Sequence, residues 1–163
     1  MSLRSIRSTE DYLSTIWQLK NENAKKNDNS DVKPVRIKDI AEKLNISSPS
    51  VSEYVRKLAK TNKLEVIDRK GVVLTETGEK EALIIVNKHR IIYCFLTNIL
   101  GLEKRSAHNQ SHDLEHVMEL DTIDNLYQFI KKQKDCDLVD CPFDEICVPP
   151  SNFNDTIARA VES

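Results

Sequence analysis

The chain has 163 residues, of which 39% are hydrophobic and 31% are charged, a composition typical of a folded globular protein. Three Gly and five Pro are too few for a fold with many turns, so a mainly α protein is expected. No apolar stretch approaches the roughly 20 residues that cross a bilayer, and the N-terminus lacks the apolar centre of a signal peptide. We therefore expect a cytoplasmic protein with no membrane partner.

The charge is divided unevenly along the chain. Residues 1–75 carry 15 Lys and Arg against 10 Asp and Glu, a net of +5, whereas residues 76–163 carry 9 against 16, a net of −7. A basic segment suits a polyanion, and an acidic segment suits cations.

A first helix is predicted from Ser8, its expected N-cap, because apolar residues recur at helical spacing after it. These residues are Tyr12, Leu13, Ile16, Trp17 and Leu19. The polar segment 21–33 that follows predicts a loop.

The next segment predicts a helix-turn-helix. Residues 37–44 form one short amphipathic helix, and Asn45–Ser47 form a turn. Ser48 as N-cap and Pro49 in the first turn begin a second helix that runs to Lys60.

A hairpin is predicted directly after these helices. Residues 64–67 and 72–74 read as strands, and Gly71 absorbs the turn between them. A helix-turn-helix followed by a hairpin with a basic tip is a winged helix.

The outer face of the second helix predicts contacts with double-stranded DNA. Hydroxyls at a helix N-terminus can approach phosphates and base edges, and basic side chains add salt-dependent attraction. The alternative to DNA binding is that these charges simply form a solvated protein surface. Only Glu53 among the outward-facing residues suggests recognition of a base, because its carboxylate could accept a hydrogen bond from cytosine. The expected DNA contacts are Ser47, Ser48, Pro49, Ser50, Ser52, Tyr54, Arg56, Lys57, Lys60, Arg69 and Lys70.

Three further helices are predicted. A long one starts after Thr75 and stops at Gly101, a second covers roughly 104–119, and a third runs from Thr122 to about Lys132. The last has an apolar stripe that is either ordinary core or half of a two-fold interface: Ile123, Leu126, Tyr127 and Ile130.

A metal site is predicted on the second of these helices. His108, His112, Glu115 and His116 would share one helical face, where imidazoles and a carboxylate suit a divalent first-row metal. His89 lies on the long helix, which can pack against this face.

Four segments resemble, in order, the diphtheria-toxin-repressor/manganese-repressor (DtxR/MntR) family over residues 8 to about 130. They are STEDYLSTIWQL, IAEKLNISSPSVSEYVRKL, VNKHRIIYCFL and HNQSHDLEHVME. The resemblance implies a homodimeric transcriptional repressor that binds operator DNA when loaded with Fe(II) or Mn(II), and no activity as an enzyme on a small organic substrate. It does not include the SH3-like third domain of longer members, for which the residues after 133 leave no room.

The resemblance also implies the liganding residues. It assigns one metal to Asp11, His89, His112, Glu115 and His116, and a second metal to His108. Three positions depart from the family pattern. Ser14 stands where manganese sensors have Glu, His112 stands where manganese sensors have Glu and iron sensors have Cys, and Tyr93 replaces a second-site carboxylate of iron sensors. The set is therefore rich in nitrogen and would also accept Co(II) or Zn(II).

Three cysteines lie close together in the C-terminal tail: Cys136, Cys141 and Cys147. They could hold a structural zinc or an iron-sulfur cluster, act as redox-sensitive thiols, or simply pack. Cys94, on an apolar helix, is expected in the core.

The predicted organisation has three parts: residues 1–75 bind DNA, 76–133 bind metal and dimerise, and 134–163 form the cysteine tail. One alternative is a hydrolytic metalloenzyme, against which stand the lack of an evident general base and of a Gly-rich loop. The other is a winged-helix regulator that senses redox state or carries a cluster through the cysteines.

Overall fold

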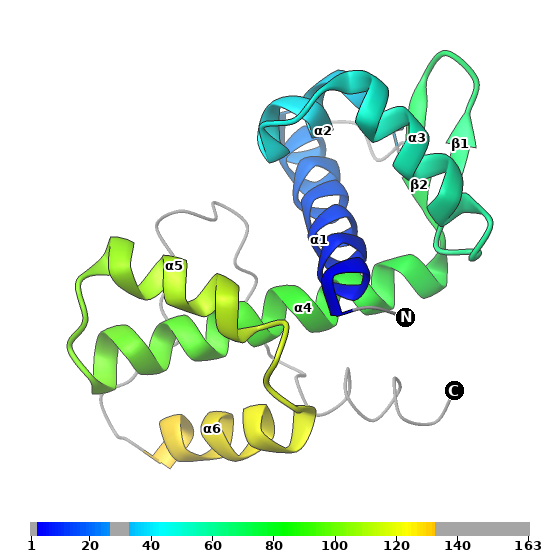
Figure 1. Cartoon of the computed structure of the whole chain (residues 1–163). Coiled ribbons are helices and arrows are strands. Elements are labelled where there is room, and N and C mark those ends of the chain that lie inside the picture. Colours follow the sequence, from blue (N-terminus) through cyan, green and yellow to red (C-terminus); the bar gives the residue numbers. More distant parts are fainter. Residues whose placement is uncertain (1–2, 27–32, 133–163) are drawn as a thin grey trace. The chain divides into compact units, whose positions relative to one another are not determined.

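The structure is a computed structural model that describes residues 3–26 and 33–132. Its elements are helices and one antiparallel hairpin, which confirms the expected fold class (Figure 1). Contacts divide the chain into two compact units, Met1–Leu83 and Ile84–Ser163. Within the described ranges, no helix is both long enough and apolar enough to cross a membrane.

Helix α1, Leu3–Lys26, extends beyond its prediction at both ends. Ser8, expected as its N-cap, lies inside the helix, and the loop predicted from Asn21 is wrong over the helix's last six residues. The Asn21 amide donates to a carbonyl one turn earlier, at 2.9 Å. Glu22 accepts from Lys43 of the next helix at 2.8 Å, so the polar segment gains tertiary support that its sequence does not reveal.

The predicted helix-turn-helix is confirmed. It consists of α2, Ile37–Leu44, and α3, Ser48–Ala59. Asn45 ends α2 in the left-handed conformation, with φ 53°, and its N–H donates to the last carbonyls of the helix. Asn tolerates this conformation better than other non-glycine residues, which explains the sharp turn.

Helix α3 begins on a cap one residue earlier than predicted. Ser47, not Ser48, is the N-cap, and its Oγ accepts the backbone N–H of Ser50 at 3.3 Å. Pro49 lies in the first turn, where the helix needs no N–H donor. Lys60, predicted as the last residue, forms the C-cap.

The wing is the predicted hairpin of β1, Leu64–Ile67, and β2, Gly71–Leu74. The chain before α2 adds a second pairing, an isolated bridge in which Val35 exchanges two backbone hydrogen bonds with Val72 at 2.8 and 2.9 Å. Gly71 has a φ of +133°, and a Cβ there would lie 2.1 Å from the Val35 carbonyl oxygen. The glycine thus permits both the wing's turn and its contact with the segment before α2.

The first unit has a continuous apolar core. α1, α2, α3 and both strands contribute to it, and the three positions predicted to face inward on α3 are buried. Its members with at most 1% exposure are Leu13, Ile16, Val35, Ile40, Val51, Val55, Leu64, Val72 and Ala82. This core fixes α3 and the wing relative to each other.

The long helix after the wing is α4, Glu76–Cys94, and it continues as a π-helical turn, η1, Phe95–Ile99. The Thr97 hydroxyl donates to the Tyr93 carbonyl at 2.8 Å, and the Leu100 N–H reaches back five residues to Phe95. Gly101, with φ +68°, ends the helix as predicted.

Two shorter helices complete the second unit. α5, Lys104–Leu114, ends earlier than the predicted residue 119, and α6, Leu120–Lys132, begins earlier than the predicted Thr122. Between them, the N–H groups of Val117 and Met118 both reach the Leu114 carbonyl, which makes a tight turn in place of another helical turn.

The second unit has its own core, formed by α4, η1, α5 and α6. The α6 stripe that could have been core or interface lies mainly in this core: Ile123, Tyr127 and Ile130 are buried, and Leu126 is half-buried. Cys94 is 1% exposed, which confirms its predicted place in the core.

Candidate metal centre and nucleic-acid interface

The carboxylate of Glu115 lies among three imidazoles. Its Oε2 is 2.6 Å from His89 Nδ1, and its Oε1 is 3.0 Å from His112 Nδ1 and 3.4 Å from His116 Nε2. All four residues belong to the second unit. His89 comes from α4 and the others from the end of α5 and its turn, so the site depends on how these two segments pack.

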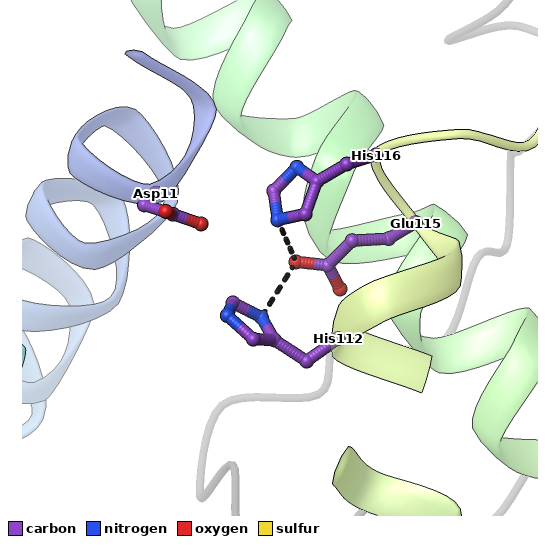
Figure 2. Close-up of side chains that lie close together, drawn as sticks. All are labelled: Asp11, His112, Glu115 and His116. Carbon is purple, nitrogen blue, oxygen red and sulfur yellow. Dashed lines mark hydrogen bonds and ion pairs between the residues drawn. The ribbon is translucent and has the colours of Figure 1, made fainter. Parts of the chain in front are cut away.

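Three of these residues form a compact ligand set. Figure 2 shows His112, Glu115 and His116 pointing toward one another, and their ligand atoms all lie within 4.8 Å of one another. The side chains of Glu115 and His116 are each 4% exposed, whereas that of His112 is 47% exposed. One side of the set is therefore open to an entering ion.

The environment keeps Glu115 anionic. Burial raises the pKa of this carboxyl group, but hydrogen bonds with His112 and His89 lower it by more, so the pKa lies below its ordinary value. A nearly buried carboxylate beside three imidazole rings is a donor set that suits a divalent cation. These residues fit a first-row metal on their own chemistry.

The predicted shared helical face is only partly correct. α5 ends at Leu114, so Glu115 and His116 lie in the turn after the helix rather than on its surface. The Glu115 N–H still donates to the Ser111 carbonyl at 2.9 Å, which keeps its side chain near that of His112. The turn then brings His116 to the same carboxylate.

His108 lies one turn before His112 and is half-buried. Its ring meets the His89 ring edge-on, with centroids 5.0 Å apart. The buried Tyr93 ring lies nearly parallel to the His89 ring, with centroids 6.4 Å apart. His89 therefore contacts both the Glu115 carboxylate and His108, the residue expected at a second metal.

The remaining predicted ligand, Asp11, lies on α1 in the first unit (Figure 2). Ser14, which stands where manganese sensors have Glu, donates a hydrogen bond from its hydroxyl to the Asp11 backbone carbonyl at 3.2 Å.

The cysteines Cys136, Cys141 and Cys147 lie outside the described residues.

The first unit has a basic groove of about 350 Å³ between α3 and the wing. Arg56 of α3 and Arg69 and Lys70 of the wing line it, as the predicted DNA interface requires. Arg36, which is not among the predicted DNA contacts, lines the groove too. Its position directly before α2 was the available signal, since a basic residue there can join the cations of the helix-turn-helix.

The N-terminus of α3 is open to a ligand. Ser47, Ser48, Pro49 and Ser50 are all exposed, and Ser52 is half-buried on the groove side. Exposed N–H groups and hydroxyls at a helix N-terminus favour a phosphate.

Further along α3, Lys57 donates to Glu53 at 2.6 Å, and this hydrogen bond lowers the pKa of Glu53 and raises that of Lys57. Both side chains are exposed, so the bond can open when Lys57 meets a polyanion.

Tyr54 differs from its prediction. It was expected to face solvent on α3, but its ring is half-buried and stacks on Tyr12 with centroids 4.5 Å apart. Its hydroxyl shares a 3.0 Å hydrogen bond with that of Thr9. Tyr54 therefore packs α3 against α1.

Comparison with known proteins covers both units. Residues 5–72 match the family model described as iron dependent repressor, N-terminal DNA binding domain. Residues 75–141 match the model described as iron dependent repressor, metal binding and dimerisation domain.

Two relatives illustrate the similarity. An HTH-type transcriptional regulator of Methanocaldococcus jannaschii is 32% identical over 129 residues, covering 79% of this chain and 97% of the relative. The diphtheria toxin repressor of Corynebacterium diphtheriae is 32% identical over 126 residues, covering 77% of this chain and 52% of the relative. The chain thus spans about half the length of the diphtheria toxin repressor.

Solved structures of metal-dependent regulators are also similar to this chain. The manganese regulator SloR has a TM-score of 0.63 and 31% identity, covering 78% of this chain and 55% of that one. ScaR with bound Zn²⁺ has a TM-score of 0.61 and 27% identity, covering 78% and 56%. The chain belongs to the iron-dependent repressor family, the DtxR/MntR family of DNA-binding transcriptional regulators.

Proposed function

We propose that this protein is a metal-dependent transcriptional repressor that binds Fe(II) or Mn(II) and, as a homodimer, operator DNA. The observation that carries the proposal is the Glu115 carboxylate, buried, ionised and within 3.4 Å of three imidazole nitrogens. Three imidazoles around one buried carboxylate place several possible ligand atoms together, and a bound dication would stabilise the folded chain.

We assign the first metal to Asp11, His89, His112, Glu115 and His116. Four of these lie together in the second unit, and the support for Asp11 is its place in the family resemblance and on α1 of the DNA-binding unit. His108, edge-on to His89, is assigned to a second metal.

In this mechanism the metal changes the affinity for DNA because it binds one arrangement of the chain better than others. Ligands on α1 and on the second unit would be joined by one ion. The joined state would fix α1, and with it the α3 that packs on α1 through Tyr54 and Tyr12. In a dimer this fixes the spacing of two recognition helices, which must match two half-sites.

The proposed DNA contacts are those of the α3 N-terminus, the later α3 cations and the wing, with Arg36 added. Their support is the exposed hydroxyls and the basic groove. Tyr54 is left out because its ring and hydroxyl are engaged with α1. The set comprises Ser47, Ser48, Pro49, Ser50, Ser52, Arg56, Lys57, Lys60, Arg69, Lys70 and Arg36.

The protein would act in the cytoplasm as a DNA-binding protein without catalytic activity. Residues 1–75 would bind DNA, and 76–133 would bind metal and dimerise. The relatives include iron-dependent and manganese regulators, and they lend no support to an iron-sulfur cluster or to redox sensing by the cysteines.

A selection experiment tests the proposal without a known operator. Double-stranded DNA is selected from a random pool with the full chain and Mn(II) or Fe(II) under anaerobic conditions, and the Kd for the selected DNA is then measured with and without chelator. We expect chelation to weaken binding by at least about tenfold, within the usual range of allosteric coupling.

Two variants complete this test. His112→Ala should lose the metal response, whereas Asn109→Ala, at an exposed position on the same helix, should keep it. Equal DNA affinity with and without metal in the wild type would refute the proposed function.

A further inference from the structure

Lys88 is a buried lysine beside the metal centre that the ligand assignment does not use. It lies on α4 and is 8% exposed. Its Nζ donates to the backbone carbonyl of Glu115 at 2.9 Å. A lysine is rarely buried unless its ammonium group has a specific partner, and here the partner is the main chain of a candidate ligand.

The position of that carbonyl explains what the contact does. Glu115 is the C-cap of α5, and the last carbonyls of a helix have no partner within the helix. The negative end of the helix dipole also lies there, which favours a cation. The Lys88 ammonium therefore caps α5 at the residue where the helix ends and the turn carrying His116 begins.

The neighbouring residue acts on the same glutamate. His89 Nδ1 is 2.6 Å from the Glu115 carboxylate, while Lys88 Nζ is 2.9 Å from the Glu115 carbonyl. Two consecutive residues of α4 thus hold the side chain and the main chain of Glu115. Together they fix the turn of α5 in position and in orientation.

We propose that Lys88 is a positioning residue for the metal centre, which holds the turn after α5 in the arrangement that presents Glu115 and His116 to the ion. This inference rests on the proposed function. Residues that orient ligands without touching the metal typically change metal affinity by about 10- to 100-fold when they are replaced.

Two effects of Lys88 on metal affinity have opposite signs, so a measurement can separate them. Its positive charge repels a dication, and removing that charge alone would strengthen metal binding. Its hydrogen bond orders the ligands, and removing that bond would weaken metal binding. We expect the second effect to dominate, because without Lys88 a buried carbonyl loses its donor and the turn can relax away from the ligand geometry.

The test uses the full chain with Co(II) as the probe, since the visible absorption of Co(II) reports both affinity and ligand geometry. Lys88→Met keeps the aliphatic stem and removes the donor and the charge. Lys80→Met is the matched control, because Lys80 lies two turns earlier on α4, where it is exposed and pairs with Glu76 at 3.2 Å. The thermal unfolding of each metal-free protein is measured in parallel.

We expect Lys88→Met to bind Co(II) about 10- to 100-fold more weakly, with an altered visible band, while Lys80→Met matches the wild type. Unchanged or tighter binding by Lys88→Met, with or without a lower melting temperature, would overturn the inference.

If Lys88→Met does not fold, Lys88→Gln is compared with Lys80→Gln. The Gln amide ends one atom short of the Lys ammonium, so it cannot repeat the 2.9 Å contact with the Glu115 carbonyl, and equal Co(II) affinity of the two variants again overturns the inference. A wild type that binds no Co(II) would instead overturn the proposed function, and this inference with it.

Discussion

His89 Nδ1 lies 2.6 Å from Glu115 Oε2, in a contact that joins the C-terminal part of α4 to the turn after α5. The two side chains are 8% and 4% exposed, so this contact is sheltered from water. Because His112 and His116 reach the other oxygen of the same carboxylate, the donor atoms are already near one another before an ion enters. Preorganisation of this kind lowers the cost of ordering the ligands.

Replacing the central carboxylate should abolish tight metal binding. Glu115→Gln keeps the shape of the side chain but removes the charge that a dication needs and replaces one acceptor oxygen by an NH2 donor. We expect the affinity for Mn(II), measured by calorimetry, to fall by more than about 100-fold. This loss is larger than the one typical of residues that orient ligands without touching the metal. Glu119→Gln, an exposed site with the same change of charge, is the control and should bind as the wild type does. Retained affinity in Glu115→Gln would remove this residue from the site.

Removing Arg36 should weaken DNA binding in a salt-dependent way. Arg36 is exposed and lines the groove with Arg56, Arg69 and Lys70, so it can neutralise one phosphate. For Arg36→Ala, we expect the slope of log Kd against log salt to fall by about one unit. Arg105→Ala removes the same charge from the second unit and should leave the slope unchanged. An unaltered slope for Arg36→Ala would mean that Arg36 does not meet the DNA backbone.

Gly71 and Gly101 both have positive φ, but only Gly71 is crowded. A Cβ at Gly71 would lie 2.1 Å from the Val35 carbonyl oxygen, whereas a Cβ at Gly101 would meet nothing within 4 Å. Gly71→Ala should therefore cost backbone strain plus a steric clash, roughly 2–5 kcal/mol, and Gly101→Ala only strain, about 1 kcal/mol. Urea unfolding of both variants measures the difference. Equal losses would show that the segment around Val35 yields easily.

The local signals in the sequence were sufficient for the DNA-binding unit. The helix α2, the turn at Asn45, the proline start of α3 and the hairpin with Gly71 all follow from capping, periodicity and turn chemistry within a few residues. The fold class and the family resemblance were therefore predicted correctly. The N-cap of α3 is Ser47 rather than the predicted Ser48, because either of these adjacent serines has a side chain that can cap a helix.

What the sequence could not reveal depended on contacts between distant segments. α1 extends to Lys26 partly because Glu22 meets Lys43, and α5 stops at Leu114 because Val117 and Met118 both turn back to one carbonyl. Helical periodicity alone continues through both points. The four residues of the Glu115 cluster were predicted, but their arrangement around one carboxylate, and the role of Lys88, required the packing of α4 on α5.

A substitution at Tyr54 can distinguish a role in packing α3 on α1 from a role in binding DNA. Tyr54→Phe removes the hydrogen bond to Thr9 and keeps the stacking on Tyr12, so we expect a loss of about 0.5–1.5 kcal/mol of stability and no change in DNA affinity. Thr9→Val removes the same bond from the other side, and in a double-mutant cycle the two losses should not add. A loss of DNA affinity at unchanged stability would return the Tyr54 hydroxyl to the DNA interface.

The cap of α5 should make part of the protein's stability dependent on pH. The Glu103 carboxylate accepts the backbone N–H groups of Arg105 and Ser106, both at 3.0 Å, and these hydrogen bonds lower its pKa. A carboxyl group whose pKa is lower in the folded state stabilises the fold above its unfolded-state pKa. This contribution is lost as the pH falls through the folded-state pKa. Glu103→Ala should therefore melt at a lower temperature than the wild type at neutral pH.

The difference in melting temperature should shrink as the pH falls below about 4.3, the ordinary pKa of a glutamate in an unfolded chain, and then through the lower folded-state pKa of Glu103. Melting curves of both proteins across this range measure it. Glu65→Ala, at an exposed strand position, is the control for loss of a negative charge. If the difference in melting temperature between the wild type and Glu103→Ala stays constant with pH, the capping hydrogen bonds do not depend on an ionised Glu103.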